Sequence, residues 1–247
     1  MSVPLISVVL VCRNPGPRVR DALASVRPQE PAGVEMVVID GASTDGTREW
    51  LGSQRAWLGA LVSEPDAGVY DAMNKGIAAA RGEWVLFLGA DDRLRDGSLT
   101  EIAPQLRQSA AGVVIGEAAY DDGRPYPFAG VDAAIRRNFI HHQAACYRRS
   151  LFATHGGFET ALRIMADYEF NLRLLAAGVR FQSVPTRVAL CGHGGLSDGG
   201  GWRVYREEIA VRHRYFPAWR CWLWDVAAIV RWLRKCVVRM NRSHART

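Results

Sequence analysis

The chain has 247 residues, of which 49% are hydrophobic and 23% charged, so it can bury the core of one large α/β domain and is not a disordered or low-complexity protein. Its five cysteines are spread without a CxxC pair, which argues against a disulfide framework or a structural zinc site and fits a reducing compartment. The net charge of +6 is uneven, because residues 1–211 sum to −2 and residues 212–247 to +8.

The first half of the chain alternates apolar runs with helical patterns. Apolar, largely β-branched runs predict strands at 5–11, 35–40, 60–63 and 83–88. Helical spacing predicts helices at 17–26, 47–52 and 69–80. This order predicts an α/β fold with a mostly parallel, twisted sheet, Rossmann-like in its first half and flanked by helices.

The second half is less regular. It predicts helices at 99–108 and 167–177, with Gly178 as the C-cap of the second, and strands at 113–116, 144–148, 181–184 and 188–191. Residues 121–124 have the composition of a hairpin turn. Residues 192–201 hold six glycines, which predicts a mobile loop.

Acidic residues follow two of the predicted strands. Asp40 ends one strand and Asp45 lies in the next turn, while Asp91 and Asp92 follow the strand at 83–88. Ligands of open parallel sheets bind beyond the carboxyl ends of the strands. Turn and cap chemistry is the alternative for Asp45 and Asp92, whereas the repetition at two strand ends favours a ligand role for Asp40 and Asp91.

A polar loop leads into the predicted helix at 69–80. Asp71, Asn74 and Lys75 lie three or four residues apart and share one face of this helix. Lys75 is one of two lysines in a chain with 29 arginines, which indicates a specific electrostatic task for a compact ammonium group. The alternative is a solvated helix face.

Three segments together resemble the family 2 glycosyltransferases: VVIDGASTDGT at 37–47, the segment 63–76, and LFLGADD at 86–92. The resemblance extends over roughly residues 5–200 and is strongest to bacterial enzymes of exopolysaccharide and lipopolysaccharide assembly, of the colanic-acid type. It implies a GT-A fold, a nucleotide-sugar donor, a divalent cation and inversion at the anomeric carbon.

The resemblance also implies roles by position. Asp40 would contact the base or ribose, with Asp45 supporting its turn, and the donor site would be lined by Glu64, Asp66, Asp71, Lys75 and Asp92. Asp91 would be the metal ligand of a DxD-like motif. The first acid of that motif is Gly89 here, so one carboxylate would hold Mg²⁺ or Mn²⁺ together with diphosphate and water, and metal dependence could be weak.

The resemblance implies a catalytic base at Asp167, at the start of the predicted helix 167–177. The alternative for Asp167 is an N-terminal helix cap, and Glu169 is the second candidate for the base. His193 lies in a segment that resembles the family's flexible loop and could meet the metal or the diphosphate, or be an ordinary loop residue. The pair His141 and His142 resembles an acceptor-side segment, and adjacent histidines rarely share a metal, so no metal role is predicted for them.

The tail at 212–247 predicts a basic amphipathic helix. Its apolar residues share one face: Trp219, Trp222, Leu223, Val226, Ile229, Val230, Leu233, Val237 and Met240. Its basic residues lie on the other: Arg220, Arg231, Arg234, Lys235 and Arg239. This pattern predicts contact of residues 219–240 with an anionic membrane surface, with packing on the catalytic body or on a partner helix as the alternatives. Nucleic acid is not predicted as a partner, because it offers no apolar surface for the tryptophans.

Together these features predict a glycosyltransferase domain at 1–211 with a membrane-associating tail, on the inner face of a bacterial cytoplasmic membrane. No secretory leader, transmembrane run or Q-x-x-R-W motif is present in this sequence, so a processive synthase is not predicted. The donor is predicted to be a uridine rather than a guanosine diphosphate sugar, and the acceptor a lipid-linked saccharide. A nucleotidyltransferase on a similar fold and a catalytically decayed nucleotide-sugar-binding scaffold are the alternatives. The sugar, the linkage and the oligomeric state are not determined by the sequence.

Overall fold

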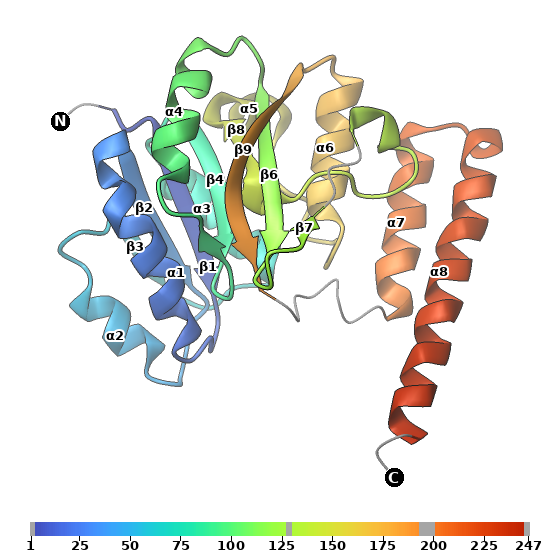
Figure 1. Ribbon diagram of the computed structural model, residues 1–247, viewed down its shortest axis with the longest axis horizontal. Coiled ribbons are helices and arrows are strands. Elements are labelled where there is room, and N and C mark those ends of the chain that lie inside the picture. Colours follow the sequence, from blue (N-terminus) through green and yellow to red (C-terminus); the bar gives the residue numbers. More distant parts are fainter. Residues whose placement is uncertain (1–2, 127–129, 193–200, 245–247) are drawn as a thin grey trace.

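The computed structural model describes residues 3–126, 130–192 and 201–244, without the side chains of 30–32 and 238–244. Its centre is a nine-stranded sheet with the strand order β3-β2-β1-β4-β8-β6-β9-β5, to which β7 adds as a partner of β6 (Figure 1). Helices cover both faces of the sheet, so the chain has the α/β architecture that the alternating pattern predicts.

The first half of the sheet is parallel, as predicted. β1 (Ile6–Cys12) lies between β2 (Val34–Asp40) and β4 (Trp84–Gly89), and β3 (Ala60–Ser63) pairs with the other side of β2. Every residue of β1 is buried, which explains why its sequence is a nearly continuous apolar run. The carboxyl ends of these strands therefore meet at one edge of the sheet.

The second half makes the sheet mixed rather than mostly parallel. β8 (Ala145–Arg148) runs antiparallel to β4 and to β6 (Val113–Tyr120), whereas β9 (Phe181–Cys191) runs parallel to β6. The short strands β5 (Arg93–Leu94) and β7 (Pro125–Tyr126) are antiparallel partners of β9 and β6.

The strands predicted at 181–184 and 188–191 are one strand, β9. Pro185 lies between Ser183 and Arg187, where the register of β9 against β6 shifts. A proline has no N–H for the ladder and is tolerated at such an irregularity, so the strand continues past it. The predicted turn at 121–124 is the tip of the hairpin that joins β6 to β7.

One apolar cluster lies on each face of the sheet. One face is covered by α1 (Arg18–Val26), α2 (Thr47–Ser53) and α4 (Ser98–Gln108). The other is covered by α3 (Val69–Ala79), α5 (Arg149–His155) and α6 (Ala166–Ala176). Short 3₁₀ helices lie at η1 (Arg27–Ala32), η2 (Val131–Ala133) and η3 (His142–Ala144). As predicted, Gly178 follows the end of α6 in a left-handed conformation, with φ of 75°.

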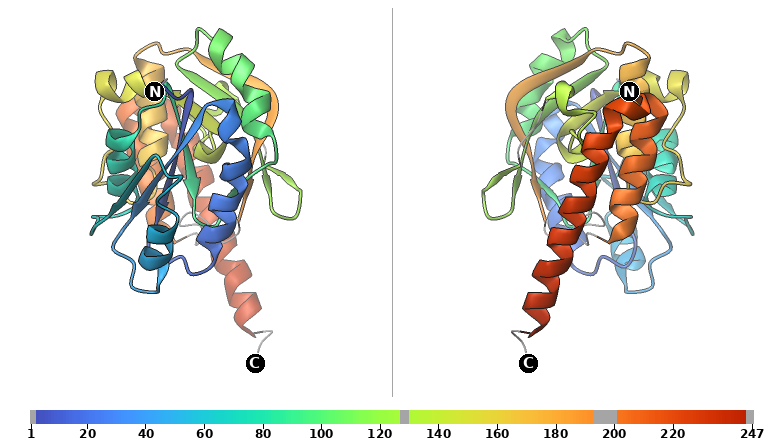
Figure 2. Two further views of the ribbon diagram at one scale, coloured as in Figure 1. Left: turned by 90° about the vertical axis from the view of Figure 1, so that its left-hand side faces the viewer. Right: turned by 90° about the vertical axis from the view of Figure 1, so that its right-hand side faces the viewer.

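Two helices, α7 (Trp202–Tyr215) and α8 (Ala218–His244), form an antiparallel pair beside α6 (Figures 1 and 2). The predicted boundary between 211 and 212 falls inside α7. The far end of α8 projects past the sheet edge where β1, β2 and β4 finish (Figure 1). None of the described helices is both long and apolar enough to cross a bilayer.

α8 has the amphipathic character that its sequence predicts. Cys221 and Ala228 are buried in the interface with the body. The predicted apolar face points away from the body and is exposed at every described side chain: Trp219, Trp222, Leu223, Val226, Ile229, Val230, Leu233 and Val237. This face therefore does not pack on the described part of the catalytic body. Met240 belongs to the side chains outside the described set.

Candidate active site

A cleft of about 590 Å³ opens at the carboxyl ends of β1 and β4. Its walls come from the end of β1, the turn 89–92, the segment 137–143, the segment 163–167 and Tyr70 at the start of α3. Of the predicted site residues, Asp91, Asp92 and Asp167 line this cleft. The acids at two separate places in the sequence thus converge, as the resemblance implies.

Asp40 lies beneath the cleft and is fully buried. Its carboxylate accepts the Ser43 N–H at 3.1 and 3.2 Å and the Ser63 hydroxyl at 2.6 Å. The Cys12 thiol lies 3.8 Å from Asp40 Oδ1 and lines the cleft above it. Burial, together with the charge of Asp40, raises the pKa of Cys12 to about 12, so this thiol stays protonated. Asp40 therefore holds the loop after β2 in place and does not itself line the cleft.

The loops after β1 and β2 interlock at the same edge. The Asn14 side-chain oxygen accepts the Thr44 N–H at 2.8 Å, and the Asp45 carboxylate accepts the Gly16 N–H at 2.8 Å. Hydrogen bonds from Thr47 and Gly16 lower the pKa of Asp45. Two non-glycine residues here have left-handed backbones, Asn14 with φ of 49° and Ala42 with φ of 56°. Such strain gathers at functional loops, and here it lies beside the cleft.

The predicted donor-site group at 64–75 forms a cluster of its own, outside the cleft lining. Lys75 Nζ bonds Glu64 Oε1 at 2.8 Å and the Pro65 carbonyl at 2.8 Å, and lies 3.5 Å from Asp71 Oδ2. Asp66 accepts the Gly68 N–H at 2.9 Å. All three ammonium donors of Lys75 thus have protein partners, so its visible task is to hold the loop 64–68.

That loop packs directly on the end of β2. A side chain at Gly41 would place its Cβ 2.1 Å from Asp66 Oδ2, so only glycine lets Asp66 come this close. The cluster of Glu64, Asp66, Asp71 and Lys75 therefore lies against the loop that Asp40 holds, and it contacts that loop at the backbone of Gly41.

The turn 89–92 presents two acids in different ways. Asp92 is buried and accepts Gln143 Nε2 at 3.0 Å, the Gly192 N–H at 3.0 Å and the Gly89 N–H at 3.2 Å. Burial, reinforced by the charge of Asp91, raises the pKa of Asp92. Asp91 makes no hydrogen bond or ion pair with the described residues and lines the cleft.

Asp91 fits a divalent cation that is shared with a substrate. Among the described residues, no three His, Cys, Asp or Glu side chains gather into a closed metal site. Mg²⁺ and Mn²⁺ accept one protein carboxylate when phosphate oxygens and water complete the shell, which matches the free Asp91 carboxylate. His193, the other predicted contact, lies outside the described residues.

Asp167 stands in the first turn of α6, with its carboxylate at the cleft. Oδ1 accepts the Tyr168 N–H at 2.8 Å and lies 3.0 Å from the Tyr70 hydroxyl, and Oδ2 accepts Asn138 Nδ2 at 2.9 Å. Burial alone would raise the pKa of this carboxyl, but His142, Asn138 and the Tyr168 N–H together hold it below its ordinary value. Asp167 is therefore ionised at neutral pH.

The segment 141–143 contributes more than the sequence predicts. His142 Nδ1 lies 3.4 Å from Asp167 Oδ2, while the next residue, Gln143, bonds Asp92. The ring of His141 packs on Tyr126, and burial lowers the pKa of His141 to about 4. The adjacent histidines are a visible signal in the sequence, but Asp167, the partner of His142, lies 25 residues away along the chain.

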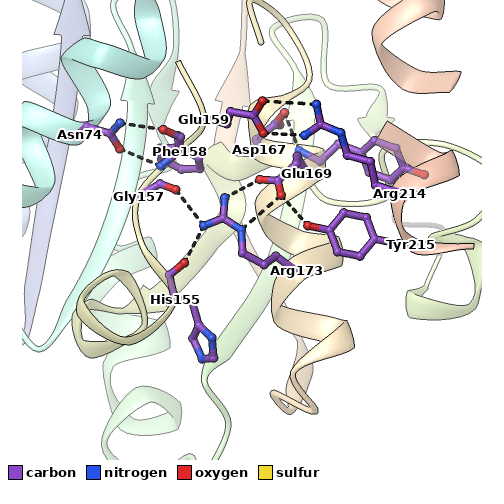
Figure 3. Close-up of polar contacts among 11 residues, drawn as sticks. Asn74, His155, Gly157, Phe158, Glu159, Asp167, Glu169, Arg173, Arg214 and Tyr215 are labelled. Atoms are coloured by element: carbon purple, nitrogen blue, oxygen red, sulfur yellow. Dashed lines mark hydrogen bonds and ion pairs between the residues drawn. The ribbon is translucent and has the colours of Figure 1, made fainter. Parts of the chain in front are cut away.

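Glu169, the second candidate for the base, belongs to a different network (Figure 3). Its carboxylate pairs with Arg173 and accepts the Tyr215 hydroxyl. Arg173 also donates to the carbonyls of His155 and Gly157, so the group ties α6 to the segment after α5. Glu169 does not line the cleft; through Arg173 and Tyr215 it instead holds α6 against its neighbouring segments.

The cleft also carries positive charge. Four arginine side chains contribute to its lining: Arg13, Arg18, Arg137 and Arg163. Arginine on a cleft wall attracts phosphate and carboxylate groups. The lining also holds four acids, Asp91, Asp92, Asp167 and Glu208, so these groups together suit a phosphorylated ligand that is bound along with a cation.

Comparison with known proteins gives one consistent group of relatives. Residues 7–167 match the model of the family described as glycosyl transferase family 2. The chain is 32% identical over 180 residues to a PGL/p-HBAD biosynthesis glycosyltransferase of Mycobacterium bovis, and the match covers 70% of each protein. It is also 32% identical over 222 residues to an uncharacterized glycosyltransferase of Mycobacterium tuberculosis, covering 85% of this chain and 81% of that protein.

Solved structures with the same arrangement include S. aureus TarS 1-349 in complex with UDP-GlcNAc. The TM-score is 0.68 at 19% identity, and the match covers 83% of this chain and 66% of that one, so this chain spans just under two thirds of it. The mannosyltransferase PcManGT from Pyrobaculum calidifontis, in complex with GDP-Man and Mn²⁺, gives a TM-score of 0.62 at 19% identity and covers 100% of this chain and 82% of that one. At such identities the likeness establishes the fold alone.

Proposed function

The chain belongs to glycosyl transferase family 2 and has the GT-A type of α/β fold, and from this premise we propose that it is an inverting, non-processive enzyme. As a glycosyltransferase it binds a nucleotide sugar, and the sugar passes to an acceptor hydroxyl. One observation carries the proposal: Asp91 and Asp167, 76 positions apart in sequence, line a single cleft.

The donor would lie with its diphosphate beside Asp91. Mg²⁺ or Mn²⁺ held by Asp91 would offset the negative charge that develops on the leaving diphosphate. Arg13 and Arg18 line the same cleft and would bind the phosphates directly. The nucleoside would rest on the loops that Asp40 and Asp45 hold, with the cluster of Glu64, Asp66, Asp71 and Lys75 behind them and Asp92 bracing the turn.

We favour a uridine diphosphate sugar, which the TarS complexes with UDP and UDP-GlcNAc support for the fold. The GDP-Man complex of the mannosyltransferase supports the alternative guanosine donor. The curated relatives are named for PGL/p-HBAD biosynthesis and not for exopolysaccharide or colanic-acid assembly. We therefore propose a lipid-linked saccharide as the acceptor, without assigning it to colanic acid.

On the acceptor side, Asp167 would be the catalytic carboxylate on which removal of the acceptor proton depends. Its side chain is 7% exposed and its oxygens are held by Asn138 and the Tyr168 N–H. Inversion needs the attacking oxygen on the face of the sugar away from the diphosphate, so the acceptor would enter between Asp167 and the anomeric carbon.

The exposed face of α8 supports binding at the inner face of a bacterial cytoplasmic membrane. Arg220, Arg234 and Lys235 are exposed beside this face, so a bilayer with anionic lipids would receive both the apolar and the charged side chains. The far end of α8 lies at the end of the molecule where β1 and β4 finish (Figures 1 and 2), and the cleft is lined by the ends of these two strands, which suits an acceptor held in the membrane.

A thermal-shift measurement with UDP and GDP, each with and without Mn²⁺, tests the donor site. A nucleotide that binds only the folded protein stabilises it by about 2.7 kcal/mol at a hundred times its Kd. We expect Asp91→Asn to lose the Mn²⁺-dependent part of this shift. Asp96→Asn, at an exposed acid outside the cleft, should retain it. An equal Mn²⁺-dependent shift in both variants would contradict the assignment of Asp91.

Product analysis with radiolabelled UDP-GlcNAc and GDP-mannose separates the activities. A transferase releases nucleoside diphosphate and labels a lipid or water-soluble acceptor. A nucleotidyltransferase would instead form the nucleoside triphosphate from pyrophosphate, and a decayed scaffold would bind the donor without turnover.

Sedimentation with vesicles tests the membrane surface. We expect binding to vesicles that contain anionic phosphatidylglycerol, and loss of binding when Trp219, Trp222 and Leu223 are all changed to serine. Val3→Ser is the matched control, because Val3 is as exposed as Trp219, at 74%, and lies at the other end of the chain. Binding that survives the triple substitution would refute the role of α8.

A further inference from the structure

Arg137 is an exposed arginine on the wall of the cleft, and the fold does not use its guanidinium group. It makes no hydrogen bond or ion pair with the described residues. Arg163, on the same wall, differs, because it donates to the Ala67 carbonyl and is thereby tied to the loop 64–68. A guanidinium group is permanently charged and carries five N–H donors, so Arg137 has donors to offer to a ligand.

The backbone that carries Arg137 is held on both sides. Before it, Arg212 donates to the carbonyls of Ile135 and Arg136 at 2.7 and 3.1 Å. After it, Phe139 is buried in the apolar cluster on the α6 face of the sheet. The guanidinium group is therefore presented by a fixed segment, and a ligand that binds it does not have to order the chain first.

This segment places Arg137 beside the proposed base. Asn138, the next residue, donates to Asp167 Oδ2 at 2.9 Å. Arg13 instead follows β1, which pairs with β4 and so lies next to the turn 89–92. The cleft thus has one positive group at the end of β1, where we place the donor phosphates, and another next to Asp167, where we place the acceptor.

The same segment also contacts the C-terminal helix. The guanidinium carbon of Arg136 lies 5.1 Å from the ring centre of Trp224 on α8, a cation–π contact. Passing from α8 toward the base, the segment therefore offers first an aromatic contact, then the unused guanidinium group of Arg137, and then Asn138 with Asp167. The order matters because we propose the exposed face of α8 as the membrane-binding surface.

The other charged groups near this wall are already compensated. Glu208 lines the cleft, but its carboxylate pairs with Arg212 and Arg231. Burial, followed by neighbouring positive charges that include Arg137, lowers the pKa of His141 to about 4, so that this ring is neutral at neutral pH. Arg137 thus supplies uncompensated positive charge beside the place proposed for the acceptor.

We propose that Arg137 binds the phosphate group that joins the acceptor saccharide to its lipid. The inference rests on the proposed function and deepens it, because it assigns the acceptor to the phosphate-linked lipids. Such an acceptor carries its lipid, its phosphate and its saccharide in this order, which matches the order of α8, Arg137 and Asp167. The planar guanidinium group binds two phosphate oxygens at once, whereas a neutral glycolipid would leave it without a partner.

Calorimetric titration of the full chain with farnesyl phosphate, at saturating UDP and Mn²⁺, tests the proposal. The donor site is then occupied, so a second phosphate must bind elsewhere. We expect the unchanged chain to bind farnesyl phosphate at least about tenfold more tightly than farnesol. Arg137→Gln should weaken the binding of farnesyl phosphate by about tenfold to a hundredfold and leave the Kd of UDP unchanged, because hydrogen bonds to a charged group are lost.

Two matched variants and the ionic strength sharpen the test. Arg137→Lys should recover part of the affinity, because an ammonium group keeps the charge but not the planar pair of donors. Arg55→Gln removes an exposed arginine outside the cleft and should change nothing. Added NaCl should weaken the binding of farnesyl phosphate to the unchanged chain more than to Arg137→Gln, because salt screens the contact between guanidinium and phosphate.

Three results would overturn the proposal. The first is equal affinity of the unchanged chain for farnesyl phosphate and farnesol, and the second is an Arg137→Gln variant that keeps the affinity for farnesyl phosphate within about twofold. The third is a variant that loses UDP instead, which would assign Arg137 to the donor diphosphate. Each leaves the proposed function standing. If neither UDP nor GDP binds with Mn²⁺, the proposed function fails, and the titration without nucleotide then reports on Arg137 alone.

Discussion

Arg212 joins the C-terminal helices to the two residues that precede the cleft-lining segment 137–143, and the effect of its removal on stability should be measurable. Its guanidinium is fully buried and donates to the carbonyls of Ile135 and Arg136 at 2.7 and 3.1 Å. It also pairs with Glu208 on α7 and with Asp225 on α8. Arg212→Met keeps an unbranched apolar stem in place of the arginine methylenes but removes every one of these donors at once.

Removing one partner of a buried ion pair costs about 3–5 kcal/mol. Here Glu208 keeps Arg231 and Asp225 keeps His213, so we expect the lower end, about 3 kcal/mol. For a chain of this size, that loss corresponds to a fall of about 6–12 °C in melting temperature. The comparison is Arg214→Met, because Arg214 pairs with Glu159 at 44% exposure and such a pair contributes at most about 1 kcal/mol.

The assay is urea unfolding followed by tryptophan fluorescence at two pH values. Burial raises the pKa of Glu208, and Arg231 and Arg212 oppose that rise, so the pKa increases further without Arg212. A carboxyl whose pKa is higher in the folded than in the unfolded state stabilises the fold at low pH, and this stability is lost as the pH rises through the folded-state pKa. The deficit of Arg212→Met should therefore be larger at pH 8 than at pH 5. A small deficit equal to that of Arg214→Met, without pH dependence, would refute the reasoning.

Three shorter predictions concern the loops and the core. Ala42 has φ of 56°, a left-handed conformation that costs a non-glycine residue about 1–2 kcal/mol. Glycine avoids this cost but loses about 0.5–1 kcal/mol of chain entropy on folding. Ala42→Gly should therefore raise the free energy of unfolding by about 0.5–1 kcal/mol in urea titrations. The pKa of Asp167 is lower in the folded protein than in the unfolded chain, so its ionised form stabilises the fold above the unfolded pKa, and this stability is lost as the pH falls through the folded pKa. The difference in melting temperature between the unchanged enzyme and Asp167→Asn should therefore shrink from pH 6 to pH 3. A difference that stays constant would speak against an ionised Asp167. Gly76→Ala places a Cβ 2.2 Å from Val9 Cγ1 and should lower the free energy of unfolding by about 1–3 kcal/mol. The control is Gly52→Ala, which has open space around its Cβ and should leave the free energy of unfolding unchanged or raise it by up to about 1 kcal/mol. Chemical unfolding measures both.

The parallel half of the fold could be predicted because each of its strands carries its own signal. β1 is buried on both faces and is therefore apolar along its whole length, and β2 and β4 repeat the pattern. The second half could not be predicted in the same way. β5 has two residues, too few for a periodic signal, and β9 contains Pro185 at a register shift, which reads as an interruption.

The sequence pattern does not predict α7, and the physical reason is different. Its buried side chains include Glu207, Glu208 and Arg212, and a sequence pattern assigns charged residues to the surface. Their burial is permitted by partners that lie far away along the chain, such as the carbonyl of Ile135. Pairings of this kind carry no periodicity, so neither the helix nor its attachment to the body can be read from local sequence.

The candidate site divides along the same line. Asp91 and Asp167 could be predicted because strand ends and helix starts are local features, and the structure brings both to the cleft. Lys75 looked like a donor ligand, yet its three donors are taken by Glu64, Asp71 and the loop backbone. His142 gave only the weak signal of adjacent histidines, because its partner is 25 residues away.

The position of Gly89, where a full DxD motif would have its first acid, has no room for a side chain in this structure. A Cβ at this position would lie 2.6 Å from Asp92 Oδ2 and 3.0 Å from Asp91 Oδ1, so a first acid would displace the two that are present. The space instead lets Asp92 turn inward and bind Gln143. Since Gln143 follows His142, the turn that presents Asp91 is tied to the residue that faces Asp167. Asp91 and Asp167, for which we propose roles on the donor and the acceptor side, are thus connected through two consecutive residues, and a further carboxylate at position 89 would disturb this arrangement.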